Sequence, residues 1–307
     1  MRDFKIDFNK AFFKVIIAYI AIFVVGVVMA CIWGVDLDIN FKGGTKISYS
    51  YTGDIDDAKV KETIDSKIDA SYTFSKSTAL AGDTKTFEIA LVGKDALTAE
   101  KQEELTKALT DGFKDNKIAI YNSNSVSPTM AGTFFVKSLV AVVITALGVV
   151  IYVGIRFKKI GGISAALTAL VALVFDVLIT FFVCVIFRLQ IDSNYIAVVL
   201  TMLGYSLNDT IVIYDRVREN NRLYPENEIG DTVNLSINQT LIRNIVTSVT
   251  TFLAVMTIVV VSEMFGLQSL RTFAIPMAFG LISGGISSLF ISGPLWVIWK
   301  RRKAKKA

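Results

Sequence analysis

Long apolar runs alternate with short polar segments along most of this chain. A run of ~20 apolar residues, rising about 1.5 Å per residue, can cross a ~30 Å hydrocarbon core as a helix. The pattern therefore predicts six transmembrane helices, at residues 13–33, 134–154, 162–187, 193–214, 244–262 and 272–298. The first run is too long for a removable signal peptide and lacks its small-residue cleavage pattern, so we interpret it as an uncleaved span.

Residues 34–132, between the first two spans, have a mixed and water-soluble pattern. Apolar residues at helical spacing predict helices at 54–69 and 98–113, the second capped by Thr98. β-Branched and aromatic residues predict four strands, at 45–52, 71–78, 84–92 and 117–126. The middle two strands form a hairpin around Ala81-Gly82-Asp83. The order β-α-β-β-α-β is that of a ferredoxin-like α+β domain, a fold that identifies no single function.

Basic residues gather on one side of the predicted bundle. They precede the first span, lie between spans two and three and between spans four and five, and form the tail KRRKAKKA. The short loops on the other side hold only Arg188 and Arg271. Because positive loops stay in the cytoplasm, we expect both termini to be cytoplasmic and residues 34–132 to be extracytoplasmic. The net charge of +5 then reflects topology, and we expect no nucleic-acid partner.

The predicted organisation has four parts: residues 1–33 with the first span, the outer domain 34–132, the remaining bundle 133–299, and the basic tail 300–307. The bundle includes a cytoplasmic loop at 215–243. In this loop four apolar residues recur at helical spacing, Ile229, Val233, Ile237 and Leu241. The spacing predicts an amphipathic helix that either lies at the inner membrane surface or packs on the bundle.

The composition supports a membrane protein and restricts its chemistry. The hydrophobic fraction is 53% and the mean hydropathy is +0.54, above the usual soluble range. Cys31 and Cys184 fall in or at the ends of spans, which argues against a disulfide framework or a metal site. The chain has no histidine, which excludes zinc hydrolysis and Ser-His-Asp catalysis in their usual forms. We expect no enzyme, no metal and no cofactor.

Strongly polar residues inside the fourth span are the main candidates for function. Asn208-Asp209-Thr210 interrupts an otherwise apolar run, and a carboxylate near the bilayer centre costs about 2.5–3.5 kcal/mol on insertion scales. Arg243 opens the fifth span and could meet Asp209 at a similar depth. Either the two form a static ion pair, or Asp209 changes its protonation during work. Burial disfavours a charged carboxylate and a guanidinium favours it, so such a pair can titrate near neutral pH.

Other roles for the membrane aspartates stay open. Asp176 lies nearer the centre of the third span, where a proton relay and a structural role are equally compatible with the sequence. Two aspartates could also serve an intramembrane protease, and Tyr214-Asp215 matches one half of that motif. The Gly-x-Gly-Asp half is absent. A purely structural subunit that holds a partner is a third class.

The last span carries small residues at a four-residue spacing. They are Pro276, Gly280, Gly284, Ser288 and Ser292. Small residues on one helix face let two helices approach closely, so the spacing predicts helix packing. A helix that slides against its neighbour would use the same surface.

The segments around these positions resemble the SecF family, the smaller half of SecD–SecF membrane complexes, which belongs with the proton-driven RND transporters. GYSLNDTIVIYDRVREN (204–220) and SINQTLIRNIVTSVTTFLAV (236–255) carry the resemblance. LRTFAIPMAFGLISGGISSLFISGPLW (270–296) is similar to the last span of the family. DINFKGGTKISYS (38–50) resembles its F-x-G-G-T segment, through Phe41, Gly43, Gly44 and Thr45.

Two positions depart from the family pattern. Asn40 stands where members often have Asp, and Phe175 precedes Asp176 where they often have His. The first departure leaves the backbone role of the glycines intact. The second removes a titratable group beside Asp176.

The resemblance implies an α-helical membrane protein with six transmembrane helices, half of an RND-type bundle, plus the ferredoxin-like outer domain. It implies a subunit of the SecDF complex, which uses the proton motive force to assist protein translocation across the bacterial cytoplasmic membrane. The family's acid and arginine fall on Asp209 and Arg243, with Asn208 beside them. Protons would be the coupling ion.

The expected partners are SecD, the SecYEG channel, YajC, an unfolded translocating polypeptide and membrane lipids. Two alternatives remain: an RND-type exporter of small molecules or lipids, and a structural subunit without proton coupling. The outer domain either moves about the glycines near Phe41 or forms a rigid platform for SecD.

Overall fold

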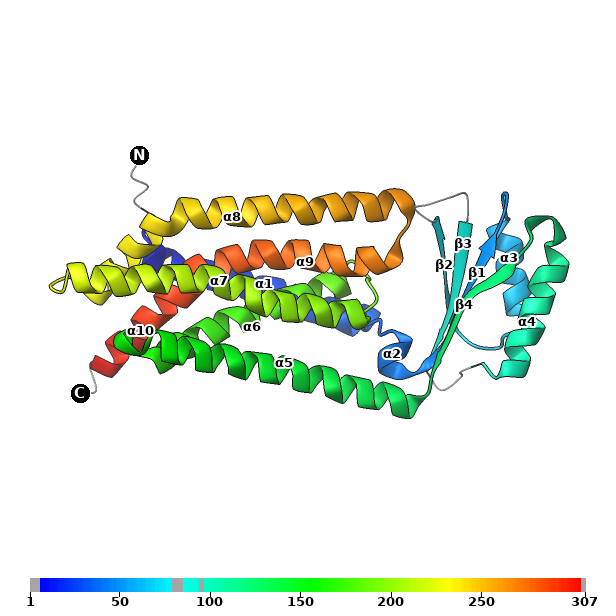
Figure 1. Cartoon of the computed structure of the whole chain (residues 1–307), viewed down its shortest axis with the longest axis horizontal. Helices are drawn as coiled ribbons and strands as arrows, with labels where there is room; N and C mark the ends of the chain where they lie inside the picture. Colours follow the sequence, from blue (N-terminus) through cyan, green and yellow to red (C-terminus); the bar gives the residue numbers. More distant parts are fainter. Residues whose placement is uncertain (1–5, 79–84, 94–96, 305–307) are drawn as a thin grey trace.

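The computed structural model describes residues 6–78, 85–93 and 97–304. A bundle of long helices occupies most of the molecule, and a small domain with a β-sheet lies at one end of it (Figure 1). The described N- and C-terminal segments both lie at the opposite end of the bundle (Figure 1). The two predicted parts of the chain are therefore separate in space.

Among the described residues, six helical segments are long and apolar enough to cross a membrane. The predicted six-helix bundle is confirmed. α1 and α5 begin before their apolar runs because Asp7 and Ser127 cap them through side-chain hydrogen bonds to backbone N–H groups. The segments are α1 (Phe8–Trp33), α5 (Pro128–Arg156), α6 (Gly162–Ile186), α7 (Ser193–Leu223), α8 (Ile229–Phe265), and a last one made of α9 (Gln268–Ser287), a π-helical turn (Ser288–Ser292) and α10 (Gly293–Ala304).

The connection between α7 and α8 differs from the prediction. Both helices extend past their apolar runs, and only residues 224–228 between them are non-helical. The predicted loop at 215–243 with its own amphipathic helix is wrong. The apolar residues Val233 and Ile237 belong to α8, are fully buried, and contact Gly293 of α10. Their four-residue spacing is satisfied by packing on the bundle, which was one of the two options.

The outer domain has the predicted ferredoxin-like arrangement. Its sheet has the order β2-β3-β1-β4 with antiparallel neighbours, and α3 and α4 cover one face (Figure 1). Tyr49 and Phe87 pack under the helices with Ile64 and Leu105. The turn of the predicted hairpin lies outside the described residues. The elements are β1 (Gly44–Tyr51), α3 (Asp57–Asp65), β2 (Tyr72–Thr78), β3 (Lys85–Val92), α4 (Ala99–Gly112) and β4 (Ala119–Val126).

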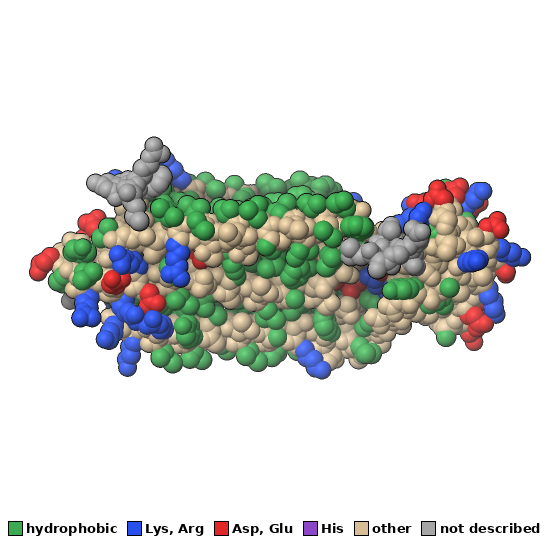
Figure 2. Space-filling model, turned by 45° about the horizontal axis from the view of Figure 1, so that its top comes forward, with side chains coloured by type: hydrophobic (Ala, Val, Ile, Leu, Met, Phe, Trp, Pro, Cys, Tyr) green, Lys and Arg blue, Asp and Glu red, His purple; other side chains and the backbone are tan. Residues whose placement is uncertain are grey.

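Charged side chains mark the two ends of the molecule. Figure 2 shows Lys and Arg gathered at the end of the bundle away from the outer domain, and hydrophobic side chains along its length. We call this the basic end. Its cations come from the α5–α6 turn, the end of α7 and α10: Lys158, Lys159, Arg218, Arg222, Arg301, Arg302 and Lys303.

Candidate functional site

Asp209 lies on α7 inside the bundle and is only 2% exposed. Its Oδ2 accepts a hydrogen bond from the Oγ of Ser248 on α8 at 3.4 Å. This is long for an O–H···O bond. A buried carboxyl group held by one weak bond can gain or lose a proton without breaking a strong contact.

Arg243 lies on the neighbouring helix α8, five residues before Ser248, the residue that contacts Asp209. Five residues correspond to roughly 7.5 Å along a helix axis. The hydroxyl of Tyr205 on α7 also donates to the carbonyl oxygen of Thr247 on α8 at 3.2 Å. Arg243 and Asn208, the residue before Asp209, line the same cavity.

The two charges are nevertheless separate in this structure. Among the described residues, the exposed side chain of Arg243 forms no ion pair of 4.0 Å or less with Asp209 or with another carboxylate. The static ion pair that the sequence left open is therefore not formed here. Asn208, next to Asp209, is also exposed.

A cavity of about 1060 Å³ connects Arg243 with the basic end. Asn208, Thr240 and Arg243 form its inner part, and Asp209 is not in its lining. Water that fills this cavity would reach Asn208, the residue that directly precedes Asp209 on α7. The remaining wall contains mostly charged residues of the basic end, including Lys159, Asp215, Arg216, Arg218, Glu219 and Arg222.

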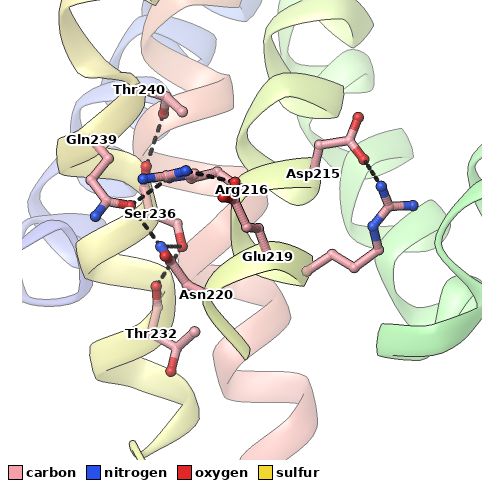
Figure 3. A network of polar contacts seen from close by, with 9 residues as sticks. Asp215, Arg216, Glu219, Asn220, Thr232, Ser236, Gln239 and Thr240 are labelled. Carbon is pink, nitrogen blue, oxygen red and sulfur yellow. Dashed lines mark hydrogen bonds and ion pairs between the residues drawn. The ribbon is translucent and has the colours of Figure 1, made fainter. Parts of the chain in front are cut away.

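Ion pairs and a hydrogen bond at the wall of this cavity join three helices. Asp215 of α7 contacts the guanidinium groups of Arg156 on α5, at 3.0 Å, and of Arg218, at 2.9 Å. Arg216 pairs with Glu219 at 2.6 Å and donates to Gln239 of α8, also at 2.6 Å (Figure 3). Asp215 is thus held between two arginines at the edge of the bundle.

A second group of hydrogen bonds joins α7 to α8 about one helical turn along α7 from Arg216. The amide of Asn220 donates to the Oγ of Ser236 at 2.8 Å and to Gln239 at 2.7 Å (Figure 3). Ser236 and Thr240 in turn bond to backbone carbonyl oxygens of α8, at 2.7 and 3.0 Å. These bonds satisfy the amide N–H groups of Asn220 and the two hydroxyls, where both helices extend beyond their apolar runs.

Asp176 is the most enclosed carboxyl group of the bundle, with 0% exposed. It accepts three hydroxyl hydrogen bonds, from Ser206 of α7 at 2.6 Å and from Ser283 and Ser287 of α9 at 2.5 and 2.8 Å. The hydroxyl of Tyr19 on α1 lies 2.9 Å from the Oγ of Ser283. We call these five residues the Asp176 cluster. It joins α1, α6, α7 and α9 at one point.

The small residues of α9 make room for this cluster. A Cβ at Gly280 would lie 2.7 Å from Thr180 of α6, and a Cβ at Gly284 would lie 3.1 Å from the Cβ of Ser206. Ser288 is fully buried at the start of the π-helical turn. Larger residues would separate α9 from α6 and α7, and would pull Ser283 and Ser287 away from the carboxyl group.

The F-x-G-G-T segment forms the junction between the outer domain and the bundle. Phe41 lies in the short helix α2 (Ile39–Lys42), with its ring 5.3 Å from that of Phe134 on α5. Gly43 and Gly44 have φ values of 80° and 136°, and a Cβ on Gly44 would collide with the carbonyl oxygen of Leu91. Thr45 is buried and accepts a hydrogen bond from the backbone N–H of Leu97 at 3.1 Å.

The junction is also tied to the loop between α6 and α7. The N–H of Asp38 donates to the carbonyl oxygen of Ile191 at 3.0 Å, and the N–H of Ile191 donates to that of Asp36 at 2.8 Å. Asn40, the departure from the family pattern, donates to the Oδ2 of Asp38 at 2.6 Å. The glycine segment is therefore held on several sides in this arrangement.

The sequence did not single out the serines around Asp176, nor Asn220 and Gln239. Ser283 and Ser287 each directly precede a position of the small-residue spacing, Gly284 and Ser288, and this was the available signal. Within the described ranges, no group of three or more His, Cys, Asp or Glu residues is arranged to hold a metal ion.

Comparisons with known proteins give one consistent result. Residues 105–302 match the family model "Protein export membrane protein SecD/SecF, C-terminal". The chain is 32% identical to the protein translocase subunit SecF of Alicyclobacillus acidocaldarius, covering 94% of this chain and 90% of that protein. It is also 32% identical to the SecF of Petrotoga mobilis, covering 99% of each.

Longer relatives match this chain over only part of their own length. The chain is 33% identical to the translocase subunit SecDF of Bacillus subtilis but spans only 37% of it. The solved structure of SecDF from Thermus thermophilus matches with a TM-score of 0.79 at 26% identity, covering 97% of this chain and 39% of that one. A SecDF in a super-membrane-facing form matches with a TM-score of 0.65 over 100% of this chain. The chain therefore belongs to the SecD/SecF family of protein export membrane proteins.

Proposed function

We propose that this chain is one subunit of a proton-driven complex that assists protein translocation, with a SecD-type chain as the other half. It spans 90% and 99% of two relatives named SecF, but only 37% of the relative named SecDF. A separate chain would supply the remainder of the longer protein. Two related halves commonly make one transporter of this class.

An exposed polar surface in the middle of the bundle supports such a partner. Thr201, Gly204 and Asn208 of α7 and Arg243 and Thr250 of α8 are exposed in the single chain. A guanidinium group in hydrocarbon costs at least ~2.5 kcal/mol. We call these five residues the polar face and propose that the partner's helices cover it.

The complex would lie in the bacterial cytoplasmic membrane with the basic end in the cytoplasm. Positive charges favour that side, and the outer domain would then lie where the translocated polypeptide emerges. The SecYEG channel, the emerging unfolded chain and YajC are the partners that this placement suggests.

Within the bundle, Asp209 would be the group that takes up and releases the proton. It is a buried carboxyl group that directly follows Asn208, and Asn208 lines the cavity of the basic end together with Arg243. One elementary charge crossing 100 mV supplies about 2.3 kcal/mol, so several protons could drive a movement of the outer domain. The weak bond from Ser248 leaves Asp209 free for this change.

Asp176 would act on the side of Asp209 that is closer to the outer domain. Ser206, its partner, precedes Asp209 by three residues, roughly 4.5 Å along the axis of α7. A proton that enters from the outside would reach the Asp176 cluster first, then Asp209, then the cavity.

Secretion of a Sec-dependent reporter, in cells deprived of the native copy, tests the proposal. Asp209→Asn should leave secretion at the level of the empty vector, and a protonophore should lower secretion only in cells with the unmodified chain. Glu226→Gln, which removes an exposed carboxylate between α7 and α8, should behave as the unmodified chain. Normal, protonophore-sensitive secretion with Asp209→Asn would sink the proton role and favour a structural subunit.

A further inference from the structure

A second cavity opens at the basic end, between the α5–α6 turn and α10. Its volume is about 700 Å³. The residues that line it are glycines, lysines, exposed apolar side chains and one serine: Gly154, Gly161, Gly162, Lys158, Lys300, Lys303, Ile155, Ile163, Trp299 and Ser164. It shares no lining residue with the cavity near Arg243, to which Lys159 contributes instead.

The glycines shape the floor of this cavity. A Cβ on Gly162 would collide with the carbonyl oxygen of Gly154, so α5 and α6 approach each other closely here. Gly161 has a φ of 98°, which disfavours other residues, and a Cβ on it would lie 2.6 Å from the Nζ of Lys300. The absence of side chains leaves backbone at the bottom and places an ammonium group directly above it.

Positive charge in the cavity is not balanced by the protein. Among the described residues, no carboxylate lies within 4.0 Å of the ammonium groups of Lys158, Lys300 or Lys303. Lys300 lies over the ring of Trp296, 5.3 Å from its centroid, which orients its side chain. In the other cavity two of the cations, Arg216 and Arg218, are paired with Glu219 and Asp215.

The start of α6 adds a further attraction for an anion. Gly161 is its N-cap residue and makes no side-chain capping bond. The free N–H groups of a long helix and its dipole favour a negative group at this end. The side chain of Ser164, which could cap, instead donates to the carbonyl oxygen of Gly161 at 2.7 Å.

The rim of the cavity faces the hydrocarbon of the membrane. Ile155 and Ile163 are 73% and 75% exposed, on helices that span the bilayer, and Trp299 is 44% exposed. A tryptophan beside lysines at a helix end is typical of the membrane interface. An occupant must therefore combine a negative head with apolar chains.

We propose that this cavity binds the headgroup phosphate of an anionic phospholipid from the leaflet at the basic end. The phosphate lies between Lys158, Lys300 and Lys303 above Gly161, and the acyl chains run along Ile155 and Ile163. Basic pockets between membrane helices bind such headgroups. This proposal does not rest on proton transfer through Asp209.

Tryptophan fluorescence of the full chain in phosphatidylcholine nanodiscs tests it. The background variant Trp33→Phe leaves Trp296 and Trp299 as the reporters, since the chain has 3 Trp residues. Brominated phosphatidylglycerol is added as a minor component and should quench at a lower fraction than brominated phosphatidylcholine. Equal quenching by the two lipids would overturn the proposal.

Matched variants separate the cavity from general surface charge. The triple variant Lys158→Gln, Lys300→Gln, Lys303→Gln should raise the phosphatidylglycerol fraction for half-quenching by roughly tenfold or more. The same positions changed to Arg should keep the original value. A control variant has Lys10, Lys14 and Arg302 changed to Gln, which are cations at the same end but outside the cavity. It should also keep the original fraction for half-quenching.

Three further results would contradict the proposal. One is an equal shift in the control variant, because charge alone would then explain binding. Another is loss of the preference in the Arg variant, because positive charge would then not hold the lipid. The third is displacement of the brominated lipid by excess inorganic phosphate, because the site would then take a soluble anion.

Discussion

The Oγ of Ser206 donates a 2.6 Å hydrogen bond to the Oδ2 of Asp176, and Ser206 lies one helical turn before Asp209 on α7. One turn of α7 therefore carries both Ser206, which donates a hydrogen bond to Asp176, and Asp209. A change in the charge of Asp176 would act on α7 directly. The two aspartates, which lie on different spans, are thus linked by a single helix and not by a direct contact.

A substitution of Asp176 can distinguish a proton-relay role of this residue from a structural role. Asp176→Asn keeps the shape but replaces one acceptor oxygen with a donor, so it should cost about 1–3 kcal/mol of stability and abolish secretion if Asp176 carries protons. Thermal unfolding and reporter secretion are measured on the same variant. Ser262→Ala, which removes a buried hydroxyl bonded only within α8, is the control. Normal secretion with lowered stability would assign Asp176 a structural role.

The exposure of Arg243 leads to a prediction that depends on the partner. Arg243→Gln in the single chain should change stability by less than about 0.5 kcal/mol, because the side chain is exposed and unpaired in the described structure. In the complex with a SecD-type chain the same change should abolish secretion, since the polar face is then covered. Chemical unfolding of the single chain and secretion in cells provide the two measurements. Arg222→Gln, at the exposed end of α7, should affect neither.

Much of this fold follows from one-dimensional patterns, and the reason is physical. The spacing of apolar residues and the length of apolar runs predict the six spans and the order of helices and strands in the outer domain, because each helix or strand buries its own apolar face. The serines of the Asp176 cluster do not follow, since Ser206 and Ser283 are far apart in sequence and converge only through packing. Hydropathy also predicts the end of α7 too early. A polar residue such as Asn220 indicates a loop when the sequence is considered alone, but here it is buried and hydrogen-bonded to Ser236 of α8.

Two glycines with similar backbone angles give a matched test of the junction. Gly44 has a φ of 136° and its Cβ would collide with the Leu91 carbonyl oxygen, whereas Gly93 has a φ of 114° and open space around it. Both changes to Ala strain the backbone by about 1–3 kcal/mol, but only Gly44→Ala adds a collision. Hydrogen exchange of the outer domain should therefore accelerate more in Gly44→Ala. Equal acceleration would show that close packing at Gly44 contributes nothing.

Asp192 should make the outer ends of α7 and α9 sensitive to pH, because it caps α7 and accepts a hydrogen bond from Thr272 of α9. Burial raises the pKa of Asp192, and hydrogen bonds from Thr272 and from the N–H groups of Tyr195 and Asn194 oppose this only in part. Because its pKa is higher in the folded than in the unfolded chain, its stabilising contribution is present at low pH and is lost as pH rises through the folded value. Unfolding temperatures of the unmodified chain should fall over this range relative to Asp192→Asn. Parallel curves for the two proteins would contradict the assignment.

A crosslink at the junction distinguishes a moving outer domain from a rigid platform. Leu37 and Ile191 form a parallel β-bridge between the segment after α1 and the α6–α7 loop. Cysteines at these positions, in a chain with Cys31→Ser and Cys184→Ala, are close enough for a disulfide. If the outer domain swings relative to the bundle during work, oxidation should stop secretion and reduction should restore it.

The single-cysteine chains, oxidised in the same way, control for effects of the oxidant. The packing of Gly44 against Leu91 favours movement of the domain as one body, because bending within the glycine segment alone would open this contact. A swing would then be expected at the ends of α1 and α5, and the disulfide between residues 37 and 191 would block it by fixing the segment after α1. Full secretion with the crosslink closed would instead identify the domain as a platform that docks its partner without moving.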